Sequence, residues 1–504
     1  MNLIVADTMA KALTLGNIAR SAIKGTSWAS VATGGFWMDF HKGSLGVNLE
    51  TLEPKLSIRN WNDLNNILLK AIDADVVYIA TSDDPRGDIM AYYITTNIYQ
   101  KFPEKVVKRI RLSELTPGAF AAAVQVETPV DIKVVEAFES RMVLDRLITF
   151  RLGQAIGFVL GRAMLPVLQI LDGASPVINC VARFEGATEF WSDPMTSSEA
   201  TKLADAIRQD PPQSFQREFL NADLAPPPYL NADDLIREGT KALRVRGSEV
   251  LAQAKSLYET GFITDPLKAE RHLDLSFFSS VIARIRELAG SNYCGRLLEG
   301  DNLGRECVRP TKIEVEPSSV PVPVRNLYRL IWGRTLASCS IPATIRREFV
   351  RFSVGDYVMT AVGSRLVVDG YRRVEVGSPT FDINNIPEDL VFKDAEAVEH
   401  CDLTEASILR AVKRVIPEIN VAAVIKALEN NHYVVFEGLN VTITAMGRNL
   451  LAVAREKFPE MLWPEFLIQS DARLHGIEKG TLSRVEALVD YCRWIDSKIP
   501  KAAK

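Results

Sequence analysis

A regular alternation of strand and helix patterns fills the first hundred residues and constrains the fold more than any other feature of the sequence. Apolar strand patterns at 3–5 and 76–80 each adjoin a helical pattern, at 9–22 and 61–74 respectively. Such an alternation predicts a mostly parallel sheet whose ligand crevice lies at the carboxyl ends of its strands. Asp7 and the acidic run at 81–88 both follow strands, so we expect them to face one crevice.

Length and charge narrow the classes of protein to consider. A chain of 504 residues is long enough for about three or four domains. With 59 Lys and Arg against 63 Asp and Glu, the net charge is −4, so any nucleic-acid surface must be local. The longest apolar run, 157–171, is too short to span a bilayer and contains Arg162. We therefore expect a cytoplasmic protein that associates with DNA or a protein partner and not with a membrane.

Two cofactors are not expected. The six cysteines form no C-x-x-C pair, which argues against a zinc ribbon. The sequence also lacks the G-x-x-x-x-G-K-[ST] loop that binds nucleotide phosphates, so we expect no ATP.

A series of short motifs between residues 3 and 448 resembles, in order and spacing, the motifs of type IA DNA topoisomerases. The likeness is greatest to the topoisomerase module of reverse gyrase. The matching segments are LIVAD at 3–7 followed by Lys11, ATGGFWMD at 32–39, VLDRL at 143–147, Gly161 with Arg162, PPPY at 226–229, GFIT at 261–264, ECVRPT at 306–311, TEAS at 404–407 and TAMGR at 444–448.

The resemblance implies a multidomain fold with α/β, α and β parts, arranged as a toroid with an N-terminal Toprim domain. We expect the Toprim domain at 1–133 and a helical base made of 134–170 plus 390–504. A β-rich arch would comprise 171–228 plus 316–389, and a helical, winged-helix-like domain at 229–315 would hold the nucleophile position.

The residue at the expected nucleophile position is an aspartate. The family cuts a DNA strand through attack of a tyrosine oxygen on a phosphodiester, and that tyrosine follows the motif matched here by GFIT. Asp265 stands in its place. A carboxylate is repelled by a phosphate, so we expect strand cleavage to be impaired. The alternative for Asp265 is an ordinary surface residue before a turn, and Tyr258 is expected to belong to the core.

The acidic run at 81–88 also departs from the family's pattern, in a way that weakens the expected catalytic site. The resemblance implies a weakened Mg²⁺ site with Asp7, Asp84 and Asp88 as ligands and Asp83 as a rival ligand, because Mg²⁺ requires several hard oxygen ligands. Arg86 replaces a glutamate and can act as a fixed internal cation. A solvated turn without metal is the alternative, since Asp, Ser, Pro and Gly all favour turns.

Several cations match phosphate-facing positions of the family. Lys11 and Arg309 are retained, and Arg305 replaces a histidine, so we treat these three with Asp265 as the catalytic set. Arg162 is also retained, whereas Phe36 replaces another histidine.

A cluster of arginines adds to the candidate DNA-binding residues. On a helix, Arg325 and Arg329 share one face, and Arg334 follows within the helix expected at 326–338. With Arg162 they form the set expected to contact DNA, although a solvated helix face explains such a cluster equally well. The basic stretch 101–111 is expected to be plain surface.

Three functions are consistent with these features. The first is a type IA topoisomerase-like protein that binds single-stranded or strained DNA and is catalytically inactive, because Asp265 replaces the tyrosine. The second is an active enzyme of this isomerase class that relaxes negatively supercoiled DNA with an unconventional site. The third is a non-catalytic structural or assembly protein that uses the fold for protein contacts.

Overall fold

The predicted parallel sheet is present near the amino terminus of the computed structural model. It contains β1 (Asn2–Ala6), β2 (Trp28–Ala32), β5 (Val76–Ala80) and β6 (Val106–Arg109) in the order β2-β1-β5-β6, with every neighbouring pair parallel. Parallel pairing places the carboxyl ends of all four strands at one edge, as expected from the strand and helix alternation.

The structure describes most of the chain and divides it into two units. The described residues are 1–41, 43–126, 128–174, 177–267, 269–298, 305–375, 384–400, 403–416 and 419–499. The first unit comprises 1–171, 247–267 and 408–504, and the second comprises 172–246 and 268–407. The finer division into four domains stays a prediction.

Helices cover both faces of the parallel sheet. Leu3 and Val5 point to one face, where they pack with residues of α2 (Trp61–Ile72) and α3 (Pro85–Lys101) such as Ile67 and Ile94. The opposite face lies against α1 (Met9–Ala22) and α4 (Pro117–Ala123), where Trp28 meets the Phe120 ring at 5.4 Å. A short antiparallel pair, β3 (Met38–Phe40) with β4 (Leu56–Ile58), lies outside the sheet.

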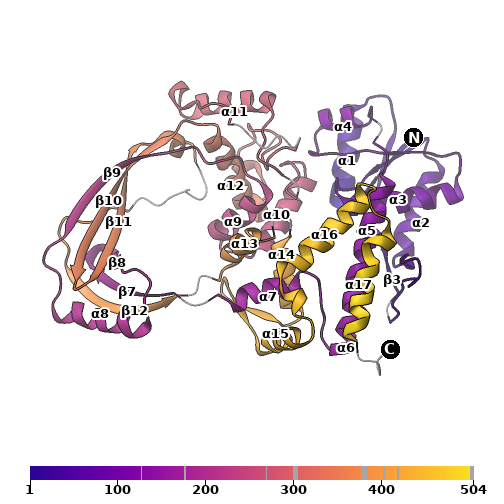
Figure 1. Ribbon diagram of the computed structural model, residues 1–504. Helices are drawn as coiled ribbons and strands as arrows, with labels where there is room; N and C mark the ends of the chain where they lie inside the picture. The colour runs from indigo at the N-terminus through magenta and orange to yellow at the C-terminus, as the bar shows by residue number, and fades with distance from the viewer. Residues whose placement is uncertain are drawn as a thin grey trace. The chain divides into compact units, whose positions relative to one another are not determined.

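The rest of the first unit is mainly helical. Figure 1 shows α5 (Ile132–Arg146) alongside α16 (Pro464–Glu478) and α17 (Arg484–Lys498), which come from the far end of the chain. A buried ion pair between Glu139 of α5 and Arg484 of α17, at 2.6 Å, joins these segments. The other elements are a π-helical turn (Leu147–Leu152), α6 (Gly153–Ile156), α7 (Met164–Asp172), α10 (Gly247–Glu259), α14 (Val421–Asn430), β13 (Val434–Glu437), β14 (Asn440–Ile443) and α15 (Ala445–Lys457).

A six-stranded antiparallel sheet dominates the second unit. The strand order is β12-β7-β8-β11-β10-β9. The strands are β7 (Val177–Phe184), β8 (Thr188–Trp191), β9 (Gln216–Leu224), β10 (Ala343–Val354), β11 (Tyr357–Val368) and β12 (Phe392–His400). The sheet therefore combines segments on both sides of a long helical insertion.

The strand β12 extends the sheet past residue 389, where the β-rich segment was expected to end. It pairs with β7, from His400 opposite Val177 to Phe392 opposite Phe184. Only Ala395 of this strand is fully buried, and half of its other residues are charged. The strand was not predicted from the sequence pattern, because charged side chains are common on edge strands and are equally common in loops.

The helices of the second unit pack on the sheet or form the insertion. The helix α8 (Ser197–Gln209) covers β7 and β12 (Figure 1). The insertion carries α9 (Ala232–Leu243), α11 (Leu275–Leu288) and α12 (Val322–Ser338). The helix α13 (Glu405–Lys413) follows β12, and its residues from 408 onward belong to the first unit. No helix within the described residues is long and apolar enough to cross a membrane.

Phe184 lies at the centre of the core between α8 and the sheet. It is 1% exposed and its ring centroid lies 5.0 to 6.2 Å from those of Phe190, Phe215, Phe352 and Phe392. We expect Phe184→Ala to cost about 3–5 kcal/mol, because the lost ring leaves a cavity in a packed core. Urea unfolding followed by circular dichroism measures this change. Phe219→Ala is the control, since Phe219 is 56% exposed on the edge strand β9 and its loss should cost under about 1 kcal/mol.

Candidate active site

The carboxyl ends of β1 and β5 form the floor of the candidate site. Ala6 and Ala80 are opposite each other in the parallel register, so Asp7 and the acidic run 81–88 leave the sheet side by side. The Asp7 carbonyl accepts hydrogen bonds from the Thr33 hydroxyl at 3.2 Å and the Gly35 N–H at 3.1 Å. The segment that follows β2 therefore contacts the residue that follows β1.

Lys11 is held next to Asp7 by the first turn of α1. Thr8 caps this helix and accepts a hydrogen bond from the Lys11 N–H, so Asp7 and Lys11 lie one turn apart. The Lys11 Nζ lies 3.2 Å from Asp7 Oδ1 and 5.6 Å from the centre of the Tyr258 ring, and the side chain is 2% exposed. A buried ammonium between a carboxylate and a ring face is a fixed positive charge at the site.

Asp265 lies in the same unit and is anchored to the segment that follows β6. Its N–H donates to the Ser113 carbonyl at 2.8 Å, and its Oδ1 accepts from the Leu267 N–H at 2.9 Å. The preceding Gly261 has φ of +81°, and a Cβ there would lie 3.0 Å from the Leu115 carbonyl oxygen. The turn that delivers position 265 therefore requires glycine.

The electrostatic surroundings of Asp265 place its carboxylate near the strand ends. Burial raises the pKa of Asp265, the Leu267 N–H and the Lys11 ammonium lower it, and the Asp84 and Asp83 carboxylates raise it further. The balance is a raised pKa. Position 265, Lys11 and the acidic run thus belong to the same unit, and the charges of Lys11, Asp83 and Asp84 influence the Asp265 carboxylate.

Tyr258 is a core residue, as expected. It is 5% exposed, and its hydroxyl donates to the Leu112 carbonyl at 2.8 Å. Burial raises its pKa well above the usual value, and the nearby Asp265, Asp7 and Asp83 carboxylates add to the shift. A buried hydroxyl that is already donating, with a raised pKa, is poorly suited to attack a phosphate.

The acidic run forms a tight turn from β5 into α3. Asp84 caps the helix and accepts a hydrogen bond from the Gly87 N–H at 2.6 Å. A Cβ at Gly87 would lie 1.8 Å from the Ser82 carbonyl oxygen, so only glycine fits there. Arg86 is exposed, and its guanidinium lies 5.5 Å from the ring of Phe36.

Two arginines that were expected to be surface residues instead enter the acidic site. Arg109 is 4% exposed, and its Nε lies 3.4 Å from Asp88 Oδ1. Arg111 reaches Asp83 at 2.6 Å and Asp88 at 2.8 Å. The interpretation of 101–111 as plain surface was therefore wrong for these two, because the β6 register places Arg109 opposite Ile79 near the end of β5, and Arg111 follows two residues later.

The carboxylates present do not fit a Mg²⁺ ion. Asp88 faces two guanidinium groups, Asp84 serves as a helix cap and Asp7 faces Lys11. In the part of the chain that the structure describes, no three Asp, Glu, His or Cys side chains converge as a metal site would require. We therefore derive no chemical step through a metal.

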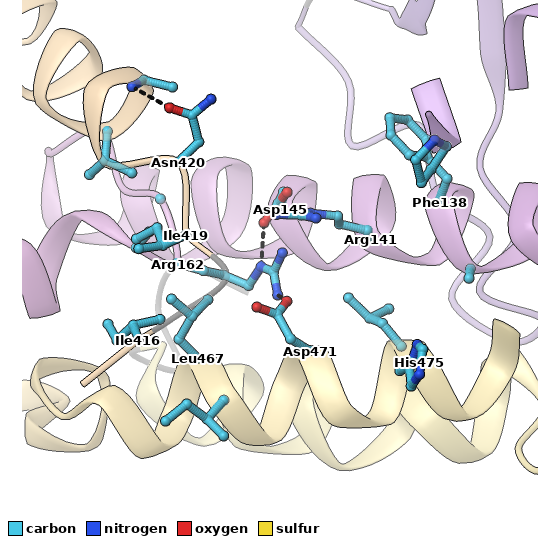
Figure 2. Close-up of a pocket in the computed structure, with 18 of the residues that line it drawn as sticks. Phe138, Arg141, Asp145, Arg162, Ile416, Ile419, Asn420, Leu467, Asp471 and His475 are labelled. Atoms are coloured by element: carbon cyan, nitrogen blue, oxygen red, sulfur yellow. Dashed lines mark hydrogen bonds and ion pairs between the residues drawn. The ribbon is translucent and has the colours of Figure 1, made fainter. Parts of the chain in front are cut away.

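A pocket of about 830 Å³ lies between α5, α14 and α16 of the first unit. Figure 2 shows Arg162 reaching between Asp145 and Asp471, with nitrogen to oxygen distances of 2.6 and 2.7 Å. Arg162 also donates to the Ser470 hydroxyl at 2.9 Å and is 4% exposed. Its guanidinium therefore joins three segments of the unit.

The lining of this pocket combines charged and apolar walls. Arg141 lines it as an exposed cation, and an apolar wall faces it. Members of that wall labelled in Figure 2 are Ile416, Ile419 and Leu467. Such a surface suits a ligand with flat apolar rings and negative charge.

The remaining predicted cations belong to the second unit and differ in accessibility. Arg305 and Arg329 are exposed, and Arg325 is half-buried with its Nε on the Val320 carbonyl. Arg334 is buried, and its guanidinium lies 2.9 Å from Glu238. Arg309 is also buried; it pairs with Glu306 and stacks 4.0 Å from the Phe277 ring centre. Arg334 and Arg309 thus hold neighbouring segments together.

Comparisons with known proteins agree with the motifs. A family model described as DNA topoisomerase matches residues 189–489, more than half of the chain. The chain is 23% identical over 546 residues to DNA topoisomerase 1 of Aquifex aeolicus (strain VF5), with 99% of each protein covered. Reverse gyrase 2 of the same organism is 24% identical over 486 residues, which span 88% of this chain and 40% of that protein.

A solved structure shows a similar fold. Full-length topoisomerase I from Thermotoga maritima superposes with a TM-score of 0.76 at 21% identity, covering 99% of this chain and 90% of that one. The expected multidomain fold with α/β, helical and β-rich parts is confirmed.

The raised pKa of Asp265 makes the stability of the first unit depend on pH. Asp265 keeps its carboxyl proton more tightly in the folded state than in the unfolded state. The free energy of unfolding therefore falls as the pH rises from the ordinary pKa of aspartate through the higher pKa of Asp265 in the folded protein. We expect Asp265→Asn to melt at a higher temperature than the parent at pH 7. The difference should vanish below the ordinary pKa range of aspartate.

Glu486→Gln is the control of opposite sign for this melting experiment. Hydrogen bonds from the Ser483 N–H and hydroxyl lower the pKa of Glu486, so its ionised form stabilises the fold above the ordinary range. Its substitution should lower the melting temperature at pH 7. An Asp265→Asn protein that is no more stable than the parent at pH 7 would contradict the burial of this carboxylate.

Proposed function

Because the chain belongs to the type IA DNA topoisomerase family, we propose that it binds single-stranded or strained DNA without cutting it. The observation that carries this proposal is the position of Asp265, whose carboxylate lies within electrostatic reach of Lys11 and Asp84. An acid thus stands where the family resemblance places the attacking tyrosine.

The chemistry of the site opposes strand cleavage. A carboxylate approaching a phosphodiester meets like charge, and Asp83 and Asp84 increase the negative potential. Tyr258, the nearest preceding tyrosine, has its hydroxyl on the Leu112 carbonyl. Lys11 supplies positive charge for a phosphate but no nucleophile. The arrangement supports binding without bond breakage.

The accessible cations support contact with a DNA strand. Arg141 lines the pocket of the first unit, and Arg329 and Arg305 are exposed in the second. Arg162 and Arg334 are each engaged by carboxylates, so we assign them to holding the binding surface in shape. Such a protein would act beside DNA in the cytoplasm, as a scaffold or regulatory component.

Plasmid relaxation tests the absence of cutting. The protein should not relax negatively supercoiled plasmid in Mg²⁺, and denaturation should trap no covalent protein–DNA species, since Asp265 stands at the expected tyrosine position and the Tyr258 hydroxyl is bonded to the Leu112 carbonyl. Asp265→Tyr should also be inactive because the acidic run pairs with arginines. The Aquifex aeolicus relative is the positive control for the assay. Relaxation by the unmodified protein would refute the proposal and favour an active enzyme.

Arg141→Ala tests the pocket as part of the DNA surface. We expect several-fold weaker binding of a fluorescent single-stranded oligonucleotide, and a salt dependence of log K that is shallower by about 0.7 for the one lost phosphate contact. Arg493→Ala is the control, since that side chain is 77% exposed on α17 and does not line the pocket. Equal losses in both variants would contradict the pocket assignment. No binding by the unmodified protein would favour the assembly function.

A further inference from the structure

The positive charge that neutralises the acidic run comes from the protein itself. Asp83 and Asp88 belong to the turn and first helical residues after β5, and each lies within 3 Å of the Arg111 guanidinium. The Asp88 side chain is buried, with 6% of its surface exposed, and the Asp83 side chain is partly exposed at 35%. Neighbouring carboxylates in such a setting require a cation to remain ionised.

Arg109 is the fixed part of this arrangement. Its Nη1 donates to the carbonyls of Ile79, Thr81 and Ile110, at 3.2, 2.9 and 2.7 Å. Its Nη2 donates to the Ser82 carbonyl at 2.7 Å, and its Nε faces Asp88. These hydrogen bonds join the end of β5, the turn and β6. The Arg109 guanidinium therefore cannot move away without breaking the hydrogen bonds that hold these three segments together.

Arg111 is the bridging part. One guanidinium nitrogen, Nη1, lies 2.6 Å from Asp83 Oδ1, and the other, Nη2, lies 2.8 Å from Asp88 Oδ1. Burial alone would lower the pKa of Arg111, but hydrogen bonds to Asp83 and Asp88 raise it overall. A planar fork with two donor nitrogens suits two carboxylates better than a lysine would, because a lysine is a point charge.

A divalent cation would compete with these groups for the same oxygens. Mg²⁺ needs near-octahedral oxygen ligands at about 2.1 Å, so it would have to displace Arg111 from both carboxylates. The guanidinium groups of Arg109 and Arg111 would also repel it across a short distance.

We propose that Arg111, supported by Arg109, serves as the permanent counter-cation of the acidic run in place of a divalent metal ion. The site then carries the same charge whether or not metal is present. Binding of nucleic acid near Lys11 would be insensitive to divalent cations, unlike that of a protein whose acidic site is loaded with metal.

Mn²⁺ titration of the full chain without DNA, followed by the electron paramagnetic resonance signal of free Mn²⁺, tests this proposal. The unmodified protein should show no stoichiometric tight site. Arg111→Gln should bind one Mn²⁺ on the order of a hundredfold more tightly, because the competing charge is removed. Arg111→Lys, which keeps the charge, should resemble the unmodified protein.

Arg59→Gln is the matched control, because Arg59 pairs with Asp39 away from the acidic run. It should leave Mn²⁺ binding unchanged. A folded Arg111→Gln protein without increased Mn²⁺ affinity would overturn the proposal.

A second measurement does not depend on the folding of the variant. The melting temperature of the unmodified protein should be the same in EDTA and in excess Mg²⁺, since a ligand that binds only the folded state would raise it. A Mg²⁺-dependent rise in this temperature, or a tight Mn²⁺ site in the unmodified protein, would overturn the proposal. Both measurements are made without DNA, so failure of the DNA-binding proposal is distinguishable from failure of this one.

Discussion

The parallel pairing of β1 with β5 is the constraint on which the rest of the site depends. It fixes Asp7 and the acidic run at neighbouring strand ends, and the next pairing, of β5 with β6, brings Arg109 beneath them. The segment that follows β6 then holds Asp265 through the Ser113 carbonyl. One sheet edge thus gathers charges from four separate parts of the chain. A one-residue slip in either pairing would turn these side chains to the opposite face.

The charges at this edge are balanced internally, so under the proposed function the fold can be kept without the family's cutting chemistry. Lys11 meets Asp7, and Arg109 and Arg111 meet Asp88 and Asp83, so the acids are stabilised without a metal. Asp265 is the exception, because burial and two carboxylates raise its pKa. The residue at the position where the resemblance expects a tyrosine therefore holds its proton more tightly than an exposed aspartate does.

Much of the fold follows from the sequence, because it depends on local patterns. The helix expected at 9–22 matches α1, and the helix expected at 61–74 matches α2 to within two residues. The order of the motifs also led us to expect position 265 together with Lys11 and the acidic run, and all three belong to the first unit. The roles of Arg109 and Arg162 could not, because their partners are set by strand register and by α16, a distant segment. The basic stretch at 101–111 resembles plain surface and Arg162 resembles a phosphate-facing cation until those long-range contacts are known.

The antiparallel sheet of the second unit has a consequence for how the protein is made. Strand β7 has β12 as a neighbour, yet β12 leaves the ribosome long after β7 and the intervening helical insertion. At ordinary rates of translation the delay is on the order of ten seconds. During that time Phe184 and Phe190 lack their full set of partners. The nascent chain must keep these rings from other chains until residue 400 has emerged, and a chaperone that shields apolar strands would favour its correct assembly.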